Sequence, residues 1–109
     1  MDASLDHLNR RLGSLALCAI HQRTIRLTCP ACQHARLLEA VTLWWMFDRR
    51  GWDDDLPRAL RRFYCARCWR RRHVAERPRF AISTVPPEGP QFTYPPEWEW
   101  KRLISRYRS

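Results

Sequence analysis

Glycine is scarce in this sequence, and long apolar runs are absent. Only three glycines stand among the 109 residues, which leaves little for a phosphate-cradling glycine loop, and neither a nucleophile elbow nor a histidine-rich nuclease pattern is present. The stretch LGSLALCAI near the N-terminus is too short and too close to charges for a signal peptide or a membrane span. We therefore expect a cytoplasmic protein that is not an enzyme and that has no membrane partner.

Acidic residues and lysine are few beside arginine. The chain has 20 basic and 11 acidic residues, a formal net charge of +9, and Lys101 is its only lysine. Such a balance points first to polyanionic partners. The length corresponds to one small domain, and small domains often need a metal ion, disulfides or a partner to be stable.

Four of the five cysteines form two C-x-x-C pairs, Cys29 with Cys32 and Cys65 with Cys68. In a reducing compartment, an odd number of cysteines with two C-x-x-C pairs favours metal binding over disulfides. Each pair can form a tight knuckle, and two knuckles complete the closed tetrahedron of thiolates that is typical of structural zinc sites. We predict one structural zinc ion on these four residues. The alternatives are a rubredoxin-like iron site, redox thiols and simple core cysteines.

The remaining candidate ligands are not expected to bind the metal. His34 and His73 lie close to the knuckles, but four sulfurs already fill a tetrahedral site. Cys18 lies within LALCAI and is expected to be a small core residue. Because zinc binding would supply folding free energy, replacing Cys65 or Cys68 is expected to unfold the protein.

Hydrophobic periodicity predicts an α+β fold. The segment RTIRLTC, residues 23–29, alternates as a strand that leads into the first knuckle, and residues 77–85 are predicted to contain a closing strand. Leucines at helical spacing predict a short helix or turn over residues 4–15. Two helices are predicted between the knuckles, over residues 35–50 and within residues 52–63.

The whole is predicted to be a small zinc-ribbon-like domain whose two knuckles are bridged by a helical hairpin, with a C-terminal amphipathic helix appended. Residues 86–96 contain five prolines and a glycine, a composition typical of an extended linker. The predicted parts are an N-terminal helix or turn (1–23), the zinc-ribbon-like domain (24–85), the linker (86–96) and the basic C-terminal helix (97–109).

The order of these motifs resembles a group of short, largely uncharacterised zinc-ribbon-like proteins of alphaproteobacteria. The resemblance is carried by TIRLTC, CPAC, RRGWDDDLPRALRRFYC and CARC, and it covers about residues 12–84. It implies the same four thiol ligands, with Gly51 and Asp53 at matching positions. Gln33 and Trp69 stand where the group usually has glycine after each knuckle. The resemblance implies a fold and a metal, and it implies no activity.

Arginines concentrate between residues 58 and 79, where nine of them stand against one acidic residue, Glu76. Phe63, Tyr64 and Trp69 interleave with them, a pattern that suits phosphate contacts and base stacking. Part of this charge would offset the negative zinc–thiolate site. We predict binding of nucleic acid, DNA or RNA, or regulation through it. The residues predicted to contact it are Arg58, Arg61, Arg62, Arg67, Trp69, Arg70, Arg71 and Arg72.

Two other interpretations of the arginines are kept. They could form a merely solvated charged face, or the protein could be a non-enzymatic adaptor whose arginine face binds an acidic protein surface. The C-terminal helix is expected first to dock on its own domain, then to contact a partner, and last to touch an anionic membrane surface. The residues predicted to contact a protein partner are Trp98, Trp100, Leu103, Ile104 and Tyr107.

Overall fold

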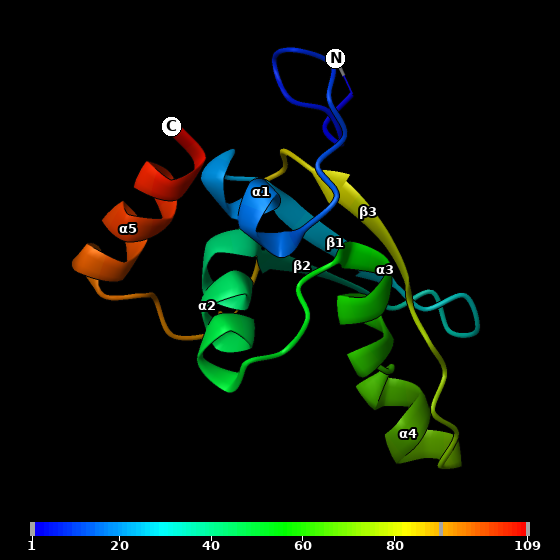
Figure 1. Ribbon diagram of the computed structural model, residues 1–109. Coiled ribbons are helices and arrows are strands. Elements are labelled where there is room, and N and C mark those ends of the chain that lie inside the picture. The colour runs from blue at the N-terminus through cyan, green and yellow to red at the C-terminus, as the bar shows by residue number, and fades with distance from the viewer. Residues whose placement is uncertain (1, 90, 109) are drawn as a thin grey trace.

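The computed structural model describes residues 2–89 and 91–108, the side chain of residue 108 excepted. In these residues a three-stranded antiparallel sheet is combined with helices (Figure 1), and the predicted α+β class is confirmed. The elements are α1 (Leu15–Ile20), β1 (Thr24–Thr28), β2 (Ala35–Glu39), α2 (Ala40–Arg50), α3 (Leu56–Ala59), the 3-10 helix η1 (Leu60–Arg62), α4 (Ala66–Arg72), β3 (Arg79–Ser83) and α5 (Glu97–Arg108).

The sheet is built around β1, which pairs antiparallel with β2 on one side and with β3 on the other. Ile25 in β1 lies opposite Leu38 of β2 and Ile82 of β3. All three side chains pack into the hydrophobic core, because residues in register share a face of a sheet. Both predicted strands are therefore confirmed, and β3 begins at Arg79.

The predicted helix over residues 35–50 is wrong in its first five positions. These residues form β2, and α2 begins only at Ala40. β2 pairs with β1 from Thr28 opposite Ala35 to Thr24 opposite Glu39, so the first knuckle is the loop of a β-hairpin. Alanine, arginine, leucine and glutamate all favour helices, and the pairing with β1 overrides that weak preference. The helix ends as predicted at Gly51, which adopts a left-handed conformation with φ 65°.

Residues 4–14 form turns rather than a helix, and α1 begins at Leu15. The buried carboxylate of Asp6 accepts hydrogen bonds from the backbone N–H groups of Leu8 (2.8 Å) and Arg10 (2.9 Å). Asn9, between them, has a φ of 60°. A carboxylate that binds its own downstream backbone competes with helix formation, so the leucine spacing in this segment does not produce a helix.

Protonation of Asp6 is expected to weaken this N-terminal turn. The backbone N–H of Arg10, the N–H of Leu8 and the Arg10 side chain hold the pKa of Asp6 below its ordinary value of 3.8. Because the folded pKa is depressed, the stabilisation is complete above the unfolded pKa and is lost as the pH falls through the folded pKa. Asp6→Asn should therefore lower Tm near neutral pH.

Thermal unfolding of wild-type protein and Asp6→Asn at a series of pH values measures this contribution. The Tm difference should shrink as the pH falls below 3.8, the ordinary pKa of aspartate. Both proteins carry the same cysteines, so acid release of a metal affects them equally and cancels in the difference. A Tm difference that stays constant down to the lowest pH would show that the carboxylate charge contributes nothing.

The C-terminal helix docks on its own domain, as expected. Leu103 of α5 is only 1% exposed and belongs to the same core as Phe47 of α2. The Trp100 ring meets Trp44 edge-on, with centroids 6.4 Å apart. The proline-rich segment before α5 is also attached, because the side chain of Gln91 accepts a hydrogen bond from the Glu39 N–H (2.7 Å).

The molecule is elongated, with principal extents of 48 × 31 × 23 Å. Figure 1 shows α5 and α4 at opposite ends, with α1, α2 and the sheet between them. Lys101 lies on α5 and is exposed, paired with Glu97 at 3.1 Å. The arginine-bearing α4 and the chain's lysine are therefore far apart.

Candidate metal centre and the arginine-bearing helix

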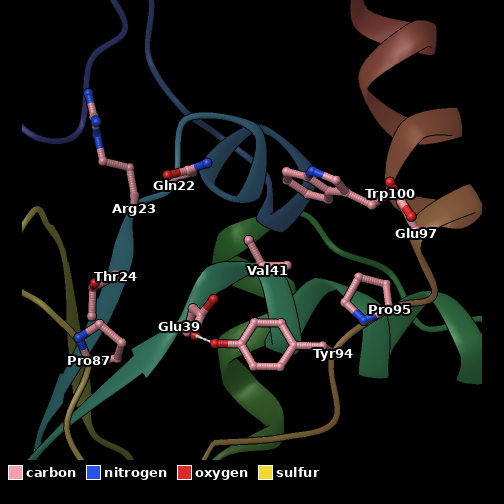
Figure 2. A pocket seen from close by; sticks show the side chains of 10 residues that line it. All are labelled: Gln22, Arg23, Thr24, Glu39, Val41, Pro87, Tyr94, Pro95, Glu97 and Trp100. Atoms are coloured by element: carbon pink, nitrogen blue, oxygen red, sulfur yellow. Dashed lines mark hydrogen bonds between the residues drawn. The ribbon is translucent and has the colours of Figure 1, made fainter.

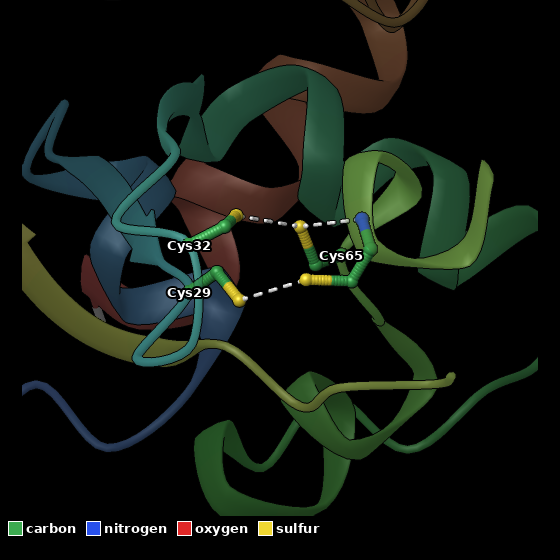
Figure 3. A group of neighbouring side chains, drawn as sticks. Cys29, Cys32 and Cys65 are labelled. Carbon is green, nitrogen blue, oxygen red and sulfur yellow. Dashed lines mark hydrogen bonds between the residues drawn. The ribbon is translucent and has the colours of Figure 1, made fainter. Parts of the chain in front are cut away.

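The four cysteines of the two knuckles meet in one cluster, with all of their sulfur atoms within 4.8 Å of one another. The Sγ of Cys29 lies 3.6 Å from that of Cys68, and the Sγ of Cys32 lies 3.6 Å from that of Cys65 (Figure 3). A tetrahedral site with metal–sulfur distances of about 2.3 Å has sulfur–sulfur edges of about 3.8 Å. The four residues thus fit a metal ion, and as a donor set they would fill its coordination sphere.

The backbone of each knuckle holds its cysteines in place. In the first knuckle, the Cys29 N–H donates to the His34 carbonyl (2.9 Å) and the Gln33 N–H donates to the Cys29 carbonyl (2.8 Å). Gln33 adopts a left-handed conformation with φ 62°, the region that glycine favours. In the second knuckle, Cys65 is the N-cap of α4, and its sulfur accepts from the Cys68 N–H at 3.5 Å.

The surroundings of the sulfurs favour negative charge at Cys29 and oppose it at Cys68. The backbone N–H groups of Cys32 and Ala31 lower the pKa of the Cys29 thiol to about 7. The guanidinium of Arg72 donates to the Cys68 sulfur at 3.3 Å. That contact lowers the pKa of Cys68, but burial and the neighbouring sulfurs raise it to about 11 overall. A divalent cation would remove this mutual repulsion.

The sulfur cluster is separate from the main hydrophobic core. Cys29, Cys65 and Cys68 form a small buried group of their own, whereas the core is built from α1, α2, α3, η1, α5, the sheet and Leu12. The helix α4 buries only Cys68. Loss of the metal is therefore expected to unfold α4 and the second knuckle only. The sequence-based expectation, by contrast, is that the whole protein unfolds.

The other cysteine lies away from the cluster. Cys18 is buried in α1 among core residues, as predicted, and burial raises the pKa of its thiol to about 12. Within the described part of the chain, the grouping of side chains that could hold a metal contains neither His34 nor His73. His73 instead ends α4 in a left-handed conformation, with its ring 5.7 Å from that of Trp69.

The structure divides the predicted arginine face between two places. Arg58 lies on α3, where its guanidinium pairs with Asp53 at 3.1 Å. Arg62 lies on η1, with its guanidinium 4.0 Å from the ring centroid of Trp52, and the carbonyl of Arg61 accepts a hydrogen bond from the side chain of Arg77. The remaining predicted residues, Arg67, Trp69, Arg70, Arg71 and Arg72, all lie on α4.

The helix α4 was not predicted, because its sequence has no apolar periodicity. It is seven residues long, begins at the Cys65 cap, and carries three arginines in its last turn, where the helix dipole favours cations. No ion pair joins Arg67, Arg70 or Arg71 to any residue in the described ranges. Arg70 and Arg71 are exposed and Arg67 is half-buried, on a helix that lies at one end of the molecule (Figure 1).

Three of these arginines border a hollow beside the metal cluster. Arg67, Arg71 and Arg72 surround Cys32 there, in a concavity of about 170 Å³. Cys32 is also the least buried of the four cysteines. Of these three, Arg72 contacts a cluster sulfur, that of Cys68, while Arg71 is exposed and has no ion pair among the described residues.

A roomier pocket lies elsewhere, between the start of α2 and the start of α5, with a volume of about 530 Å³. No pattern in the sequence predicts this pocket. Figure 2 shows the Tyr94 hydroxyl donating a hydrogen bond to the carboxylate of Glu39 across this pocket, and the Arg23 side chain pointing away from it. The guanidinium of Arg23 donates to the carbonyls of Ala3, His21 and Leu5. A polyanion would meet the carboxylates of Glu39 and Glu97 here, so this pocket does not suit nucleic acid.

The residues predicted to contact a protein partner are unequally available. Leu103 is buried, and Trp100 and Ile104 are half-buried. Trp98 and Tyr107 remain exposed, Trp98 at 63%. A partner on α5 would therefore contact mainly these two side chains.

Comparison with protein families, curated proteins and solved structures finds no match for this chain. Within the ranges that the structure describes, no helix combines the length and the apolar character that crossing a membrane requires. The site itself therefore carries the functional argument.

Proposed function

We propose that this protein is a small zinc-binding module of the cytoplasm, related to the zinc-ribbon-like group that its sequence resembles. Support comes from a closed set of four cysteine sulfurs at nearly tetrahedral spacing. Zinc suits this set, although iron uses the same thiolates. Four sulfurs leave no coordination position for water, so the ion would hold the fold together and catalyse nothing.

The function that the site supports best is nucleic-acid binding through α4. The observation that carries this proposal is the group of arginines on α4 that have no carboxylate partner among the described residues, at an exposed end of the molecule. One tetrathiolate site with a charge near −2 is offset in part by Arg72 at 3.3 Å from Cys68. Arg70 and Arg71 are left for phosphates, which guanidinium groups bind with directed hydrogen bonds.

Fluorescence anisotropy of labelled oligonucleotides against the metal-loaded protein tests this function. Wild-type protein should bind with micromolar or tighter affinity at about 0.15 M ionic strength, with a steep salt dependence. Arg70→Ala/Arg71→Ala should bind about 10- to 100-fold more weakly, because each contact is a charge-assisted hydrogen bond. It should also lose about one unit of salt slope for each arginine removed.

The matched control removes two cations from the other end of the molecule. Lys101→Ala/Arg102→Ala makes the same change in net charge on α5. It should leave both the affinity and the salt slope near the wild-type values. Equal losses in the two double variants would mean that only net charge matters and would contradict a site on α4.

The alternative function is an adaptor for an acidic protein surface, using the same arginines together with α5. Exposed Trp98 and Tyr107 favour it, because tryptophan and tyrosine are enriched in protein interfaces. Wild-type protein that binds no oligonucleotide at physiological salt, but captures a partner that survives nuclease treatment, would favour the adaptor.

A further inference from the structure

We infer that the nucleic acid bound by this protein is single-stranded, with unpaired bases lying on a row of aromatic side chains formed by Tyr64, Trp69 and His73. The inference rests on the proposed nucleic-acid function and deepens it, because it names the form of the ligand. Whether the strand is DNA or RNA is decided by the test below.

The three rings of this aromatic row are in contact and open to solvent. The Trp69 centroid lies 6.0 Å from that of Tyr64 and 5.7 Å from that of His73, and both contacts are edge-on. Tyr64 is 53% exposed and Trp69 is 45% exposed. Neither of these two large rings belongs to the main core or to the sulfur cluster. Packing within the domain therefore does not account for them.

A hollow adjoins the row at Tyr64 and adds polar groups from the other knuckle. It has a volume of about 110 Å³, and its lining includes His34 and Arg36 beside Tyr64 and Phe63. His34 and Arg36 come from the β1–β2 hairpin, whereas Tyr64 precedes the second knuckle. A ring stacked on Tyr64 would place its edge near the imidazole of His34, which can hydrogen-bond to base edges.

Arginine charge lies next to the row. Arg70 follows Trp69 directly on α4, is exposed, and has no ion pair among the described residues, so its guanidinium is available for a connecting phosphate. Aromatic faces beside guanidinium groups are the arrangement by which proteins bind single strands with little sequence preference. Charge alone would serve a duplex equally well, so the row is the feature that distinguishes the two ligands.

A duplex cannot use the row. Its bases are already stacked and paired, so no base face is free to lie on Trp69 without the cost of unpairing. A single strand has free base faces, and each base stacked on an aromatic side chain contributes severalfold to more than a hundredfold in affinity. Substitutions in the aromatic row should therefore weaken the binding of single strands only. Substitutions of the arginines should weaken the binding of both ligands.

The test compares labelled oligo(dT) and oligo(U) with a mixed-sequence duplex, for wild-type, Trp69→Ala and Trp69→Phe proteins loaded with zinc. Trp69→Ala should lose about tenfold or more in affinity for the single strands while its salt slope stays unchanged. Trp69→Phe should recover most of that loss. Duplex binding should be weaker than single-strand binding in the wild type and unchanged in both variants.

An exposed tryptophan outside the row is the matched control. Trp98→Ala removes an indole that is 63% exposed on α5, and it should bind all three oligonucleotides as the wild type does. Zinc content and circular dichroism of each variant show whether α4 and the metal site remain intact. A stronger preference for oligo(U) over oligo(dT) would identify RNA as the natural strand, and the reverse would identify DNA.

Two results would overturn the inference in distinguishable ways. If wild-type protein binds duplex and single strand equally, and Trp69→Ala changes neither, the proposed nucleic-acid function stands and the aromatic row has no part in it. If wild-type protein binds none of the three oligonucleotides at physiological salt, the proposed function and the inference fall together.

Discussion

Replacing Cys68 with serine is expected to abolish metal binding and to unfold α4 while the hydrophobic core stays folded. Structural zinc in small peptides contributes about 10–16 kcal/mol of apparent binding free energy, so loss of one of four ligands should remove most of the force that holds the second knuckle. The core does not share this dependence, because its buried residues lie in a separate cluster. Nucleic-acid binding should be lost together with α4.

Metal analysis and amide hydrogen exchange measure the two halves of this result. Cys68→Ser should retain less than one metal ion per chain, and amides of residues 64–78 should lose protection while those of α2 keep it. Cys18→Ala is the matched control, because Cys18 is buried in α1, away from the cluster. Loss of protection throughout Cys68→Ser would show that the metal stabilises the whole chain.

Truncating Phe47 to alanine is expected to destabilise the hydrophobic core and to leave the metal site intact. Phe47 is fully buried, and its ring contacts Trp52 edge-on at 5.2 Å and Phe63 at 6.3 Å. The cavity left by such a truncation typically costs about 3–5 kcal/mol, a large share of the roughly 5–15 kcal/mol by which small domains are stable. Phe47 and the cysteines of the knuckles belong to different buried clusters, so the metal affinity of the folded protein should be unchanged.

Chemical denaturation monitored by circular dichroism gives the free energy of unfolding of Phe47→Ala. Leu8→Ala is the control, because Leu8 is largely exposed and its truncation should change the free energy by at most about 0.5 kcal/mol. A wild-type midpoint for Phe47→Ala would contradict the position of this ring at the centre of the core. A loss of metal at native conditions would contradict the independence of the two clusters.

The metal centre is the part of the structure that could be predicted most fully. Thiolate chemistry and C-x-x-C spacing are local signals, and they identified the four cysteines that the fold brings together. The strand before the first knuckle was also visible, because Ile25 and Leu27 alternate with exposed Arg26. In both cases the information lies within a few consecutive residues.

The failures arise where distant residues decide the local structure. Leu37 and Leu38 belong to a segment of good helix formers, and only pairing with β1 makes it a strand. The helix α4 has no apolar stripe, since it is fixed at one end by Cys65 and Cys68 rather than by a core-facing side. Neither cause can be read from hydrophobic periodicity.

The sequence predicts one continuous arginine face, whereas the structure divides these residues between α3, η1 and α4. Sequence proximity groups Arg58 with Arg70, yet Arg58 is paired with Asp53 on α3. The charge of Arg62 lies over the ring of Trp52. Arg70 and Arg71 on α4, by contrast, are exposed and have no ion pair among the described residues, a distinction that depends on three-dimensional contacts.

The solitary lysine on α5 makes the molecule easy to orient. Apart from the chain's amino terminus, Lys101 carries the only primary amine, and it lies at the end of the molecule opposite α4. Amine-reactive dyes or sensor surfaces that couple at this side chain would leave the arginine-bearing helix facing the solution. Because lysine is so scarce, Lys101 can be used to immobilise the protein in a chosen orientation, with no engineered tag near the proposed binding surface.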